Sequence, residues 1–154
     1  MTAVIADPAA FVNEAERMTN ERDVDGIRTV FAPDGTMTAT IDGLTMTAHG
    51  LDAIHEQWDV MCRFMQSRAM YVRKTLVSAG DRVIVNEWTG SLGGTTDARG
   101  IEVWELDDAG LVRSHRLYGF LNAGPATGVR PSLRMLASYP LSALSFARAR
   151  LRSR

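Results

Sequence analysis

The sequence predicts an α+β fold, with three helices in the N-terminal part, a curved antiparallel sheet packed against them, and a helical extension at the C-terminus. Two observations predict it. Up to about residue 65, apolar residues recur at helical spacing, and one hairpin interrupts this pattern. From about residue 69 to residue 121, four runs rich in β-branched and aromatic residues follow, joined by short turns.

The first two helices are predicted from their starts and stops. Residues from about 7 to 22 form the first, with Asp7 as its N-cap and Pro8 at the first helical position. A second, short helix is predicted for about residues 24–31. The Pro-Asp-Gly sequence at 33–35 is expected to end it, because proline and glycine favour turns.

A hairpin and a third helix follow. Polar and apolar residues alternate on both sides of Asp42 and Gly43, and Asp-Gly between two such runs is a strong signal for a two-residue hairpin turn. The third helix is predicted to begin near Gly50. Its apolar stripe consists of Leu51, Ile54, Trp58, Met61, Cys62 and Met65.

Four strands are predicted after the third helix. The first lies around residues 69–78, and the other three lie within residues 82–121. A tight turn at residues 107–110 joins the last two.

Polar side chains alternate with tryptophan on two of these strands. Because successive side chains of a strand point to opposite faces, Asn86 shares a face with Trp88, and Glu102 shares one with Trp104. A carboxylate and an amide between tryptophans are unusual for a plain core. The pattern indicates a ligand pocket with a polar point in an apolar wall.

Composition indicates an ordinary globular domain. The chain has 154 residues, of which 45% are hydrophobic and 23% charged. No apolar run approaches the ~20 residues that span a bilayer, so no membrane insertion is expected. The single cysteine, Cys62, cannot form an internal disulfide, which favours a cytoplasmic location.

Charge is distributed unevenly along the chain. All 18 acids lie at or before Asp108 with nine Lys and Arg residues, giving −9, whereas the other 46 residues hold eight arginines and no acid, giving +8. We expect residues 123–154 to be a linker and a basic amphipathic extension, helical at about 131–139 and 141–152. Packing against the acidic body or a partner subunit is the favoured role. The alternative is binding to nucleic acid or anionic lipid. It is disfavoured because the basic run is short and the chain as a whole is acidic.

The order of the elements resembles the nuclear transport factor 2-like superfamily, which includes SnoaL-like polyketide cyclases and ketosteroid isomerases. The resemblance covers about residues 8–122 and is carried by segments 23–34, 49–54, 86–90, 100–112 and 116–120. It implies that residues 1–122 form a cone-shaped domain in which the curved sheet encloses an apolar cavity. It also implies a hydrophobic small molecule as ligand and a homodimer formed through the outer faces of the sheets.

Most of the family's catalytic residues have no counterpart here. In the steroid isomerases of this fold, a tyrosine donor, an aspartate base and a protonated acid act together. The matching positions are Ala15, Ala39 and Glu102, so only the acid is present. Burial between Trp88 and Trp104 is expected to raise the pKa of Glu102, which would let the protonated acid donate a hydrogen bond.

The catalytic triad of limonene-type epoxide hydrolases is missing as well. Its Asp, Arg and Asp correspond to Gly90, Trp88 and Leu117 in this chain. Epoxide hydrolysis by the family route is therefore not expected.

His115 is the second candidate catalytic residue, because imidazole is well suited to proton transfer near neutral pH. Counting from the turn glycine, Gly110, places it on the face that carries Glu102. A bulge in the turn would instead bring Arg116 and Tyr118 to that face. The Glu102–His115 pair could be catalytic, or it could be a structural ion pair or a satisfied core histidine.

The predicted site thus combines an acid, Glu102, and a base, His115. The predicted substrate-binding residues are Asn86, Trp88, Trp104, Tyr118 and Trp58. No set of residues has metal-ligand spacing, so neither a metal nor another cofactor is expected. The predicted function is that of a cofactor-independent isomerase, cyclase or dehydratase for a hydrophobic polyketide- or steroid-like substrate. The alternatives are a non-catalytic binding protein for an apolar ligand and a dimeric interaction module that uses the basic C-terminal segment.

Overall fold

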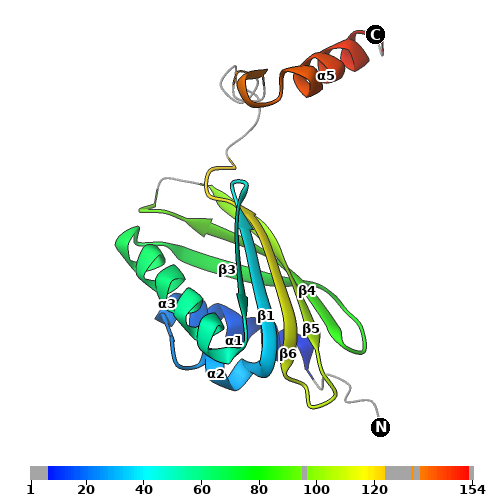
Figure 1. The fold of residues 1–154 in the computed structure, drawn as a ribbon. Coiled ribbons are helices and arrows are strands. Elements are labelled where there is room, and N and C mark those ends of the chain that lie inside the picture. The colour runs from blue at the N-terminus through cyan, green and yellow to red at the C-terminus, as the bar shows by residue number, and fades with distance from the viewer. Residues whose placement is uncertain (1–6, 95–96, 124–132, 134–135, 153–154) are drawn as a thin grey trace. The chain divides into compact units, whose positions relative to one another are not determined.

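The computed structural model describes residues 7–94, 97–123, 133 and 136–152. These residues form two compact units, one ending at Ala123 and one after it. Figure 1 shows the elements of each.

The described residues of the first unit form a six-stranded, strongly curved sheet that is not closed into a barrel (Figure 1). The strands are β1 (Phe31–Ile41), β2 (Leu44–His49), β3 (Tyr71–Ala79), β4 (Val83–Ser91), β5 (Ala98–Leu106) and β6 (Val112–Phe120). Their order is β2-β1-β6-β5-β4-β3. The predicted strands β3 to β6 pair antiparallel, whereas β1 runs parallel to β6. The predicted α+β fold with a curved sheet is confirmed.

Three helices lie against one face of this sheet: α1 (Pro8–Glu21), α2 (Ile27–Val30) and α3 (Leu51–Ser67) (Figure 1). The predicted start of α1 is confirmed, because the side chain of Asp7 accepts a hydrogen bond from the amide of Ala10 at 2.9 Å. The buried residues of α3 come from its predicted stripe: Ile54, Trp58, Cys62 and Met65. Burying apolar side chains against the sheet is what holds both helices in place.

The second helix is shorter than predicted. It begins only at Ile27, because the side chain of Asp23 accepts a hydrogen bond from the amide of Gly26 at 2.9 Å and folds residues 24–26 into a turn. The predicted stop at 33–35 lies inside β1, where the register with β6 is irregular between Phe31 and Thr36. The backbone is already extended at Phe31, with φ −91° and ψ 144°, and the Phe31 side chain is buried in the core at 1% exposure.

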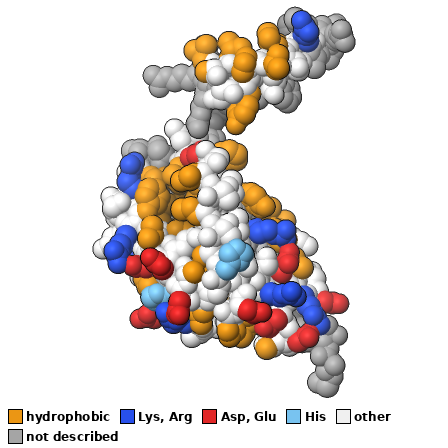
Figure 2. Space-filling model, in the orientation of Figure 1, with side chains coloured by type: hydrophobic (Ala, Val, Ile, Leu, Met, Phe, Trp, Pro, Cys, Tyr) orange, Lys and Arg blue, Asp and Glu red, His pale blue; other side chains and the backbone are white. Residues whose placement is uncertain are grey.

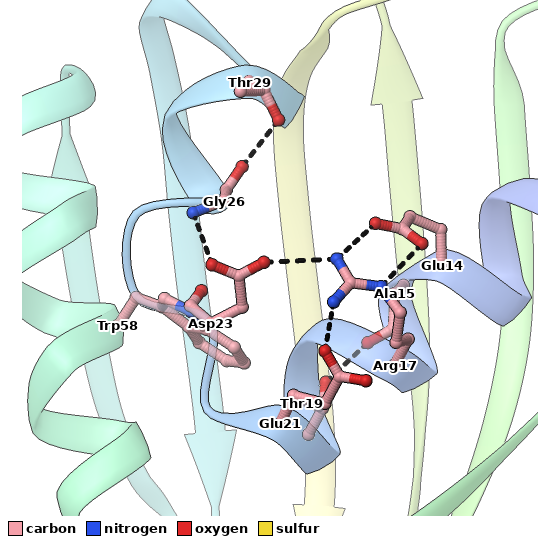
Figure 3. Close-up of polar contacts among 9 residues, drawn as sticks. All are labelled: Glu14, Ala15, Arg17, Thr19, Glu21, Asp23, Gly26, Thr29 and Trp58. Carbon is pink, nitrogen blue, oxygen red and sulfur yellow. Dashed lines mark hydrogen bonds and ion pairs between the residues drawn. The ribbon is translucent and has the colours of Figure 1, made fainter.

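A network around Arg17 joins α1 to this turn (Figure 3). Its guanidinium forms ion pairs with Glu14, Glu21 and Asp23. The backbone oxygen of Asp23 in turn accepts a hydrogen bond from the indole of Trp58 at 2.9 Å, which ties the turn to α3. These contacts link α1 to α3 through the turn that precedes α2.

The edge strand β3 is covered by α1. The side-chain amide of Asn20 donates to the backbone oxygen of Val72 at 2.8 Å and accepts from its amide at 2.9 Å. Two residues further along β3, the backbone amide of Lys74 donates a hydrogen bond to a carboxylate oxygen of Glu16 at 2.5 Å. Side chains of α1 therefore satisfy backbone groups that an edge strand would otherwise expose, and they fix the position of Lys74.

The hairpin of β1 and β2 turns at Asp42 and Gly43 as predicted. Both residues have positive φ, 50° and 86°, as a tight two-residue turn requires, and Ile41 pairs with Leu44 across it.

The second unit contains α5 (Pro140–Arg152), which agrees with the helix predicted for about 141–152. The proline occupies the start of the helix, where its missing amide costs nothing. The predicted linker at 122–131 and the helix predicted for 131–139 lie mostly outside the described residues. Within the described ranges, no helix is long and apolar enough to cross a membrane.

Candidate functional site

A buried polar cluster lies on the inner face of the sheet, built from β3, β4, β5 and β6. The ammonium of Lys74 donates to both carboxylate oxygens of Glu102, at 2.8 Å to Oε1 and 2.7 Å to Oε2. The side-chain amide of Asn86 donates to Oε2 at 2.7 Å, and the indole of Trp104 donates to the Asn86 oxygen at 2.7 Å. Side chains of Lys74 and Glu102 are only 5% and 3% exposed. The cluster is therefore an ion pair in a nearly dry environment, satisfied by hydrogen bonds.

The register of β5 and β6 decides that His115, not Arg116, shares the face of Glu102. The turn encloses one residue more than the predicted 107–110, and a further one-residue shift follows it. The pairs concerned are Leu106 with Val112, Glu105 with Ser114 and Trp104 with His115. Because two shifts of one residue restore the alternation of faces, the prediction that His115 lies on the face of Glu102 is confirmed.

His115 is enclosed by aromatic rings. Its imidazole stacks on the Trp104 ring at 3.8 Å between centroids, with an edge contact to Phe31 at 6.2 Å. The Nε2 atom lies 3.6 Å from Oε1 of Glu102, which is too far for a hydrogen bond. Neither ring nitrogen has a hydrogen-bond partner among the described residues. Burial lowers the pKa of His115, and the nearby carboxylate of Glu102 opposes that effect only in part, so the ring is neutral at pH 7.

The predicted protonation state of Glu102 is wrong. Burial does raise its pKa, but the positive charge of Lys74 and the neighbouring His115 outweigh burial, and the pKa falls to about 2. An ionised carboxylate has no proton to donate. The prediction failed because it considered only the tryptophans around Glu102 and not a cation from β3.

An apolar cavity of about 470 Å³ lies between α3, the β1–β2 hairpin and the inner face of the sheet. Figure 2 shows hydrophobic side chains gathered in the hollow between α3 and the hairpin. Most lining residues are apolar, among them Met46, Val60, Met61, Phe64, Met65 and Leu117. Two charged residues belong to the described lining, Asp42 in the hairpin turn and Lys74. This volume is in the usual range for small-molecule pockets.

Trp88 forms part of the cavity wall and lies flat across two glycines. A Cβ atom at Gly100 would come within 2.6 Å of Trp88 Nε1, and one at Gly119 within 2.5 Å of its Cζ2. The indole can lie against the backbone of β5 and β6 only because both positions lack side chains. The ring is only 4% exposed, and its face is part of the cavity wall.

The structure brings together only part of the predicted site. Trp88 lines the large cavity, whereas Glu102 and His115 do not belong to its described lining; the residue of the buried cluster that does is Lys74. Asn86 and Trp104 belong to the hydrogen-bond network around Glu102.

Two predicted substrate-binding residues lie elsewhere. Tyr118 is 47% exposed and pairs with Ile101 on the outer face of the sheet, because its neighbour Leu117 takes the inward position. Trp58 lines a separate small cavity of about 50 Å³ between the helices and the sheet, where Lys74 and Trp104 also appear. Tyr118 was therefore placed on the wrong face of its strand, and Trp58 lines the small cavity instead of the large one.

Lys74 is the residue of the buried cluster that the sequence prediction missed. Two signals could have found it. It is the only lysine in the chain, among 16 arginines. It also shares a strand face with Val72 and Leu76 on the first of the four predicted strands, β3, so it occupies an inward position between apolar residues.

Other reactive groups do not form a second centre in the part of the chain that the structure describes. Three or more His, Cys, Asp or Glu side chains nowhere converge there as they would around a metal ion. The thiol of Cys62 is buried in the core, and burial raises its pKa to about 11. Cys62 is thus a core residue.

The fold and the site together define a small ligand-cavity protein: a curved sheet and three helices around an apolar hollow with one buried ion pair at its inner end. The chain belongs to the SnoaL-like domain family, whose sequence profile matches residues 12–115. The resemblance to the nuclear transport factor 2-like superfamily is thereby confirmed. No curated protein sequence matches the chain significantly.

Solved structures share the fold at low sequence identity. A protein of unknown function with a cystatin-like fold from Methylobium petroleophilum PM1 superimposes with a TM-score of 0.63 at 23% identity, covering 84% of each chain. A steroid Δ-isomerase from Pseudomonas aeruginosa gives 0.56 at 17%, covering 94% of this chain and 99% of its own. The epoxide hydrolase/cyclase-like enzyme SalBIII, involved in pyran ring formation in salinomycin, gives 0.55 at 18%, covering 73% and 89%. At these identities the likeness concerns the fold alone.

Proposed function

We propose that this protein binds a hydrophobic small molecule and converts it by acid–base chemistry, as an isomerase, cyclase or dehydratase. The substrate is of polyketide or steroid type, with a carbonyl group at the inner end of the cavity. The observation that carries the proposal is the buried ammonium of Lys74, a residue that lines a mostly apolar cavity.

Lys74 is suited to hold a substrate oxygen. An ammonium has three hydrogen-bond donors, and two of them are used on Glu102, which leaves one for a ligand in the cavity. A fixed donor in a dry site strongly stabilises negative charge that develops on a carbonyl oxygen during enolisation. Glu102 keeps the ammonium in position and does not itself touch the substrate. It is therefore a positioning residue in this proposal, and the donor role first expected of Glu102 belongs to Lys74.

The proton acceptor we propose is Asp42. It is the carboxylate among the described residues that line the cavity, and the hairpin turn holds it in place. Its Oδ2 atom accepts a hydrogen bond from the amide of Leu121 at 3.2 Å, which orients the side chain. His115 does not belong to the described lining of the cavity, so the role of base goes to Asp42 in this proposal.

Enolisation can be tested without knowing the natural substrate. In D₂O at neutral pD, the native protein should accelerate exchange of the acetyl methyl protons of 2-acetylnaphthalene, followed by proton NMR. Removing both charges with the Lys74→Met/Glu102→Gln double variant should reduce that acceleration roughly 100-fold, the usual value of an oxyanion donor. Asp42→Asn should reduce it by a similar factor, about that of a general base.

A matched control is available on the outer face. Arg116 and Glu105 form an ion pair there, with side chains 44% and 43% exposed. Removing it as Arg116→Met/Glu105→Gln should leave the exchange rate unchanged. Equal exchange in the native protein and in the Lys74→Met/Glu102→Gln variant would refute the enzymatic proposal.

The second candidate is a non-catalytic carrier for an apolar ligand. It is favoured by the state of Glu102, because both of its oxygens are already bonded and its pKa of about 2 makes it a weak base. A carrier would bind 2-acetylnaphthalene without accelerating exchange. Its Lys74→Met/Glu102→Gln variant would differ from the native protein in affinity alone.

A further inference from the structure

The role of His115 is unexplained by the proposed function, and its surroundings suggest one. Its side chain is 4% exposed, yet neither ring nitrogen has a hydrogen-bond partner among the described residues. Buried polar atoms without partners are rare and call for a reason. The imidazole also lies next to the ion pair that would bind the ligand.

Two contacts of His115 would help to hold a positive charge on the ring, although burial keeps the ring neutral in the ligand-free site. A carboxylate oxygen of Glu102 lies 3.6 Å from Nε2, so a shift of less than 1 Å would make a charge-assisted hydrogen bond. Trp104 stacks on the ring at 3.8 Å, and the face of an indole attracts cations. Phe31 packs against another side.

Burial, and after it the charge of Lys74, oppose protonation of His115 in the ligand-free site. The charged groups that face His115 from the described elements around it are Glu102 on β5 and Lys74 on β3. From β1, its neighbours Met37 and Phe31 carry no charge. Because Lys74 and Glu102 already balance, a proton on His115 would leave the buried cluster with an uncompensated positive charge, which is costly.

An anionic ligand reverses this balance. If a carboxylate, phenolate or enolate binds Lys74, the cluster holds two negative charges and one positive charge in a nearly dry place. A buried uncompensated charge is strongly unfavourable, and uptake of one proton would remove it. His115 has both the vacant nitrogen and the adjacent carboxylate needed to hold that proton.

We infer that the site binds apolar weak acids, such as carboxylic acids, phenols and enols, as the anion together with one proton, and that His115 holds this proton. The inference rests on the proposed binding of a ligand oxygen at Lys74. It adds a ligand class, a proton balance and a function for a residue that does not line the cavity.

Calorimetry on the full-length protein can measure the proton. The probes are 2-naphthoate, an anion, and 2-acetylnaphthalene, a neutral ketone of nearly the same shape. Each is titrated at pH 7 in two buffers that differ in their heat of ionisation, because the difference in observed heat gives the number of protons taken up. The variant is His115→Gln, and the control is His55→Gln, which removes an exposed histidine paired with Asp25.

Naphthoate should bind the native protein and the His55→Gln control with uptake of roughly 0.5 to 1 proton, whereas the ketone should bind with none. Naphthoate should also bind more tightly as the pH falls from 8 to 6, by up to about tenfold per pH unit for one coupled proton. In His115→Gln, the uptake and this pH dependence should disappear while ketone binding is preserved.

The possible failures separate the two proposals. Naphthoate binding without proton uptake would overturn the inference and leave the proposed function standing. Uptake that persists in His115→Gln would also overturn it, since the proton would then lie elsewhere, for example on Glu102. If neither probe binds the native protein, the proposed function fails and the inference fails with it.

Discussion

At the scale of single residues, the buried pair of Lys74 and Glu102 is the central feature of this protein. Removing two charges from water is expensive, so each residue depends on the other and on the hydrogen bond from Asn86. The folded-state pKa of Glu102, about 2, lies below the ordinary value of the unfolded chain. Its contribution to stability is therefore complete above the unfolded pKa, about 4.3, and is lost as the pH falls toward 2.

Replacing Glu102 by glutamine should destabilise the protein, because Lys74 would remain buried without a counter-charge. We expect a loss of about 3–5 kcal/mol in the free energy of unfolding, measured by urea denaturation at pH 7. The Lys74→Met/Glu102→Gln variant should recover most of this loss, since it buries no unpaired charge. Glu105→Gln on the exposed outer face should cost less than about 1 kcal/mol. A small effect of Glu102→Gln would contradict the burial of this pair.

The residue scale also shows what the sequence pattern could predict. The inward positions of Asn86, Trp88, Glu102 and Trp104 follow from alternation within single strands, and the prediction was right. The prediction of a raised pKa for Glu102 was wrong because a cation on another strand, 28 residues away in the sequence, lowers that pKa. Alternation identifies faces, but it does not measure distances between strands.

At the scale of elements, the wall of the cavity depends on two glycines that face Trp88. Gly100 on β5 and Gly119 on β6 pair with each other, and the indole covers both. The large ring therefore occupies little of the cavity's depth. Any side chain at either glycine would displace the indole.

Gly119→Ala should push Trp88 toward the cavity and weaken ligand binding. Its Cβ would lie 2.5 Å from Trp88 Cζ2, closer than van der Waals contact allows, so the ring must move. We expect a loss of about 1–3 kcal/mol in the free energy of unfolding and weaker binding of 2-acetylnaphthalene by calorimetry. Gly80→Ala is the matched control, because nothing lies within 4 Å of its Cβ position. Unchanged binding in Gly119→Ala would show that Trp88 does not shape the cavity.

Element boundaries were predicted well where local chemistry fixes them. The cap at Asp7 and the hairpin at Asp42 depend on neighbouring backbone groups, and the predictions were right. The start of β1 was missed because the extended backbone at Phe31 is stabilised by burial against distant elements. The parallel pairing of β1 with β6 is equally non-local.

At the scale of the whole molecule, the described residues form two compact units with different chemistry. The first, up to Ala123, contains the sheet, the three helices and the cavity. The second contains α5, whose Leu141 and Leu144 side chains are 79% and 51% exposed. Acids occur only up to Asp108, so the two units also differ in charge.

We predict that the first unit folds and binds ligand independently of the second. A chain truncated after Ala123 should keep its cooperative thermal transition by circular dichroism, with a midpoint within a few degrees of the full chain. Its affinity for 2-naphthoate should stay within about twofold, since none of the described cavity-lining residues lies in the second unit. Loss of the transition, or a much lower affinity, would show that the extension is part of the cone domain. Sedimentation of both chains would test the predicted homodimer.

The sequence by itself determined the α+β class, the family, the start of α1, the hairpin turn, and the inward face on which Glu102 and Trp88 lie. These follow from periodicity and from contacts between residues close in the chain. Only the tertiary structure decided that Lys74 neutralises Glu102 and that His115 shares the face of Glu102 after two register shifts. It also decided that Tyr118 lies on the outer face of the sheet. Each of these depends on how separate strands align, and a shift of one residue exchanges the two faces of a strand.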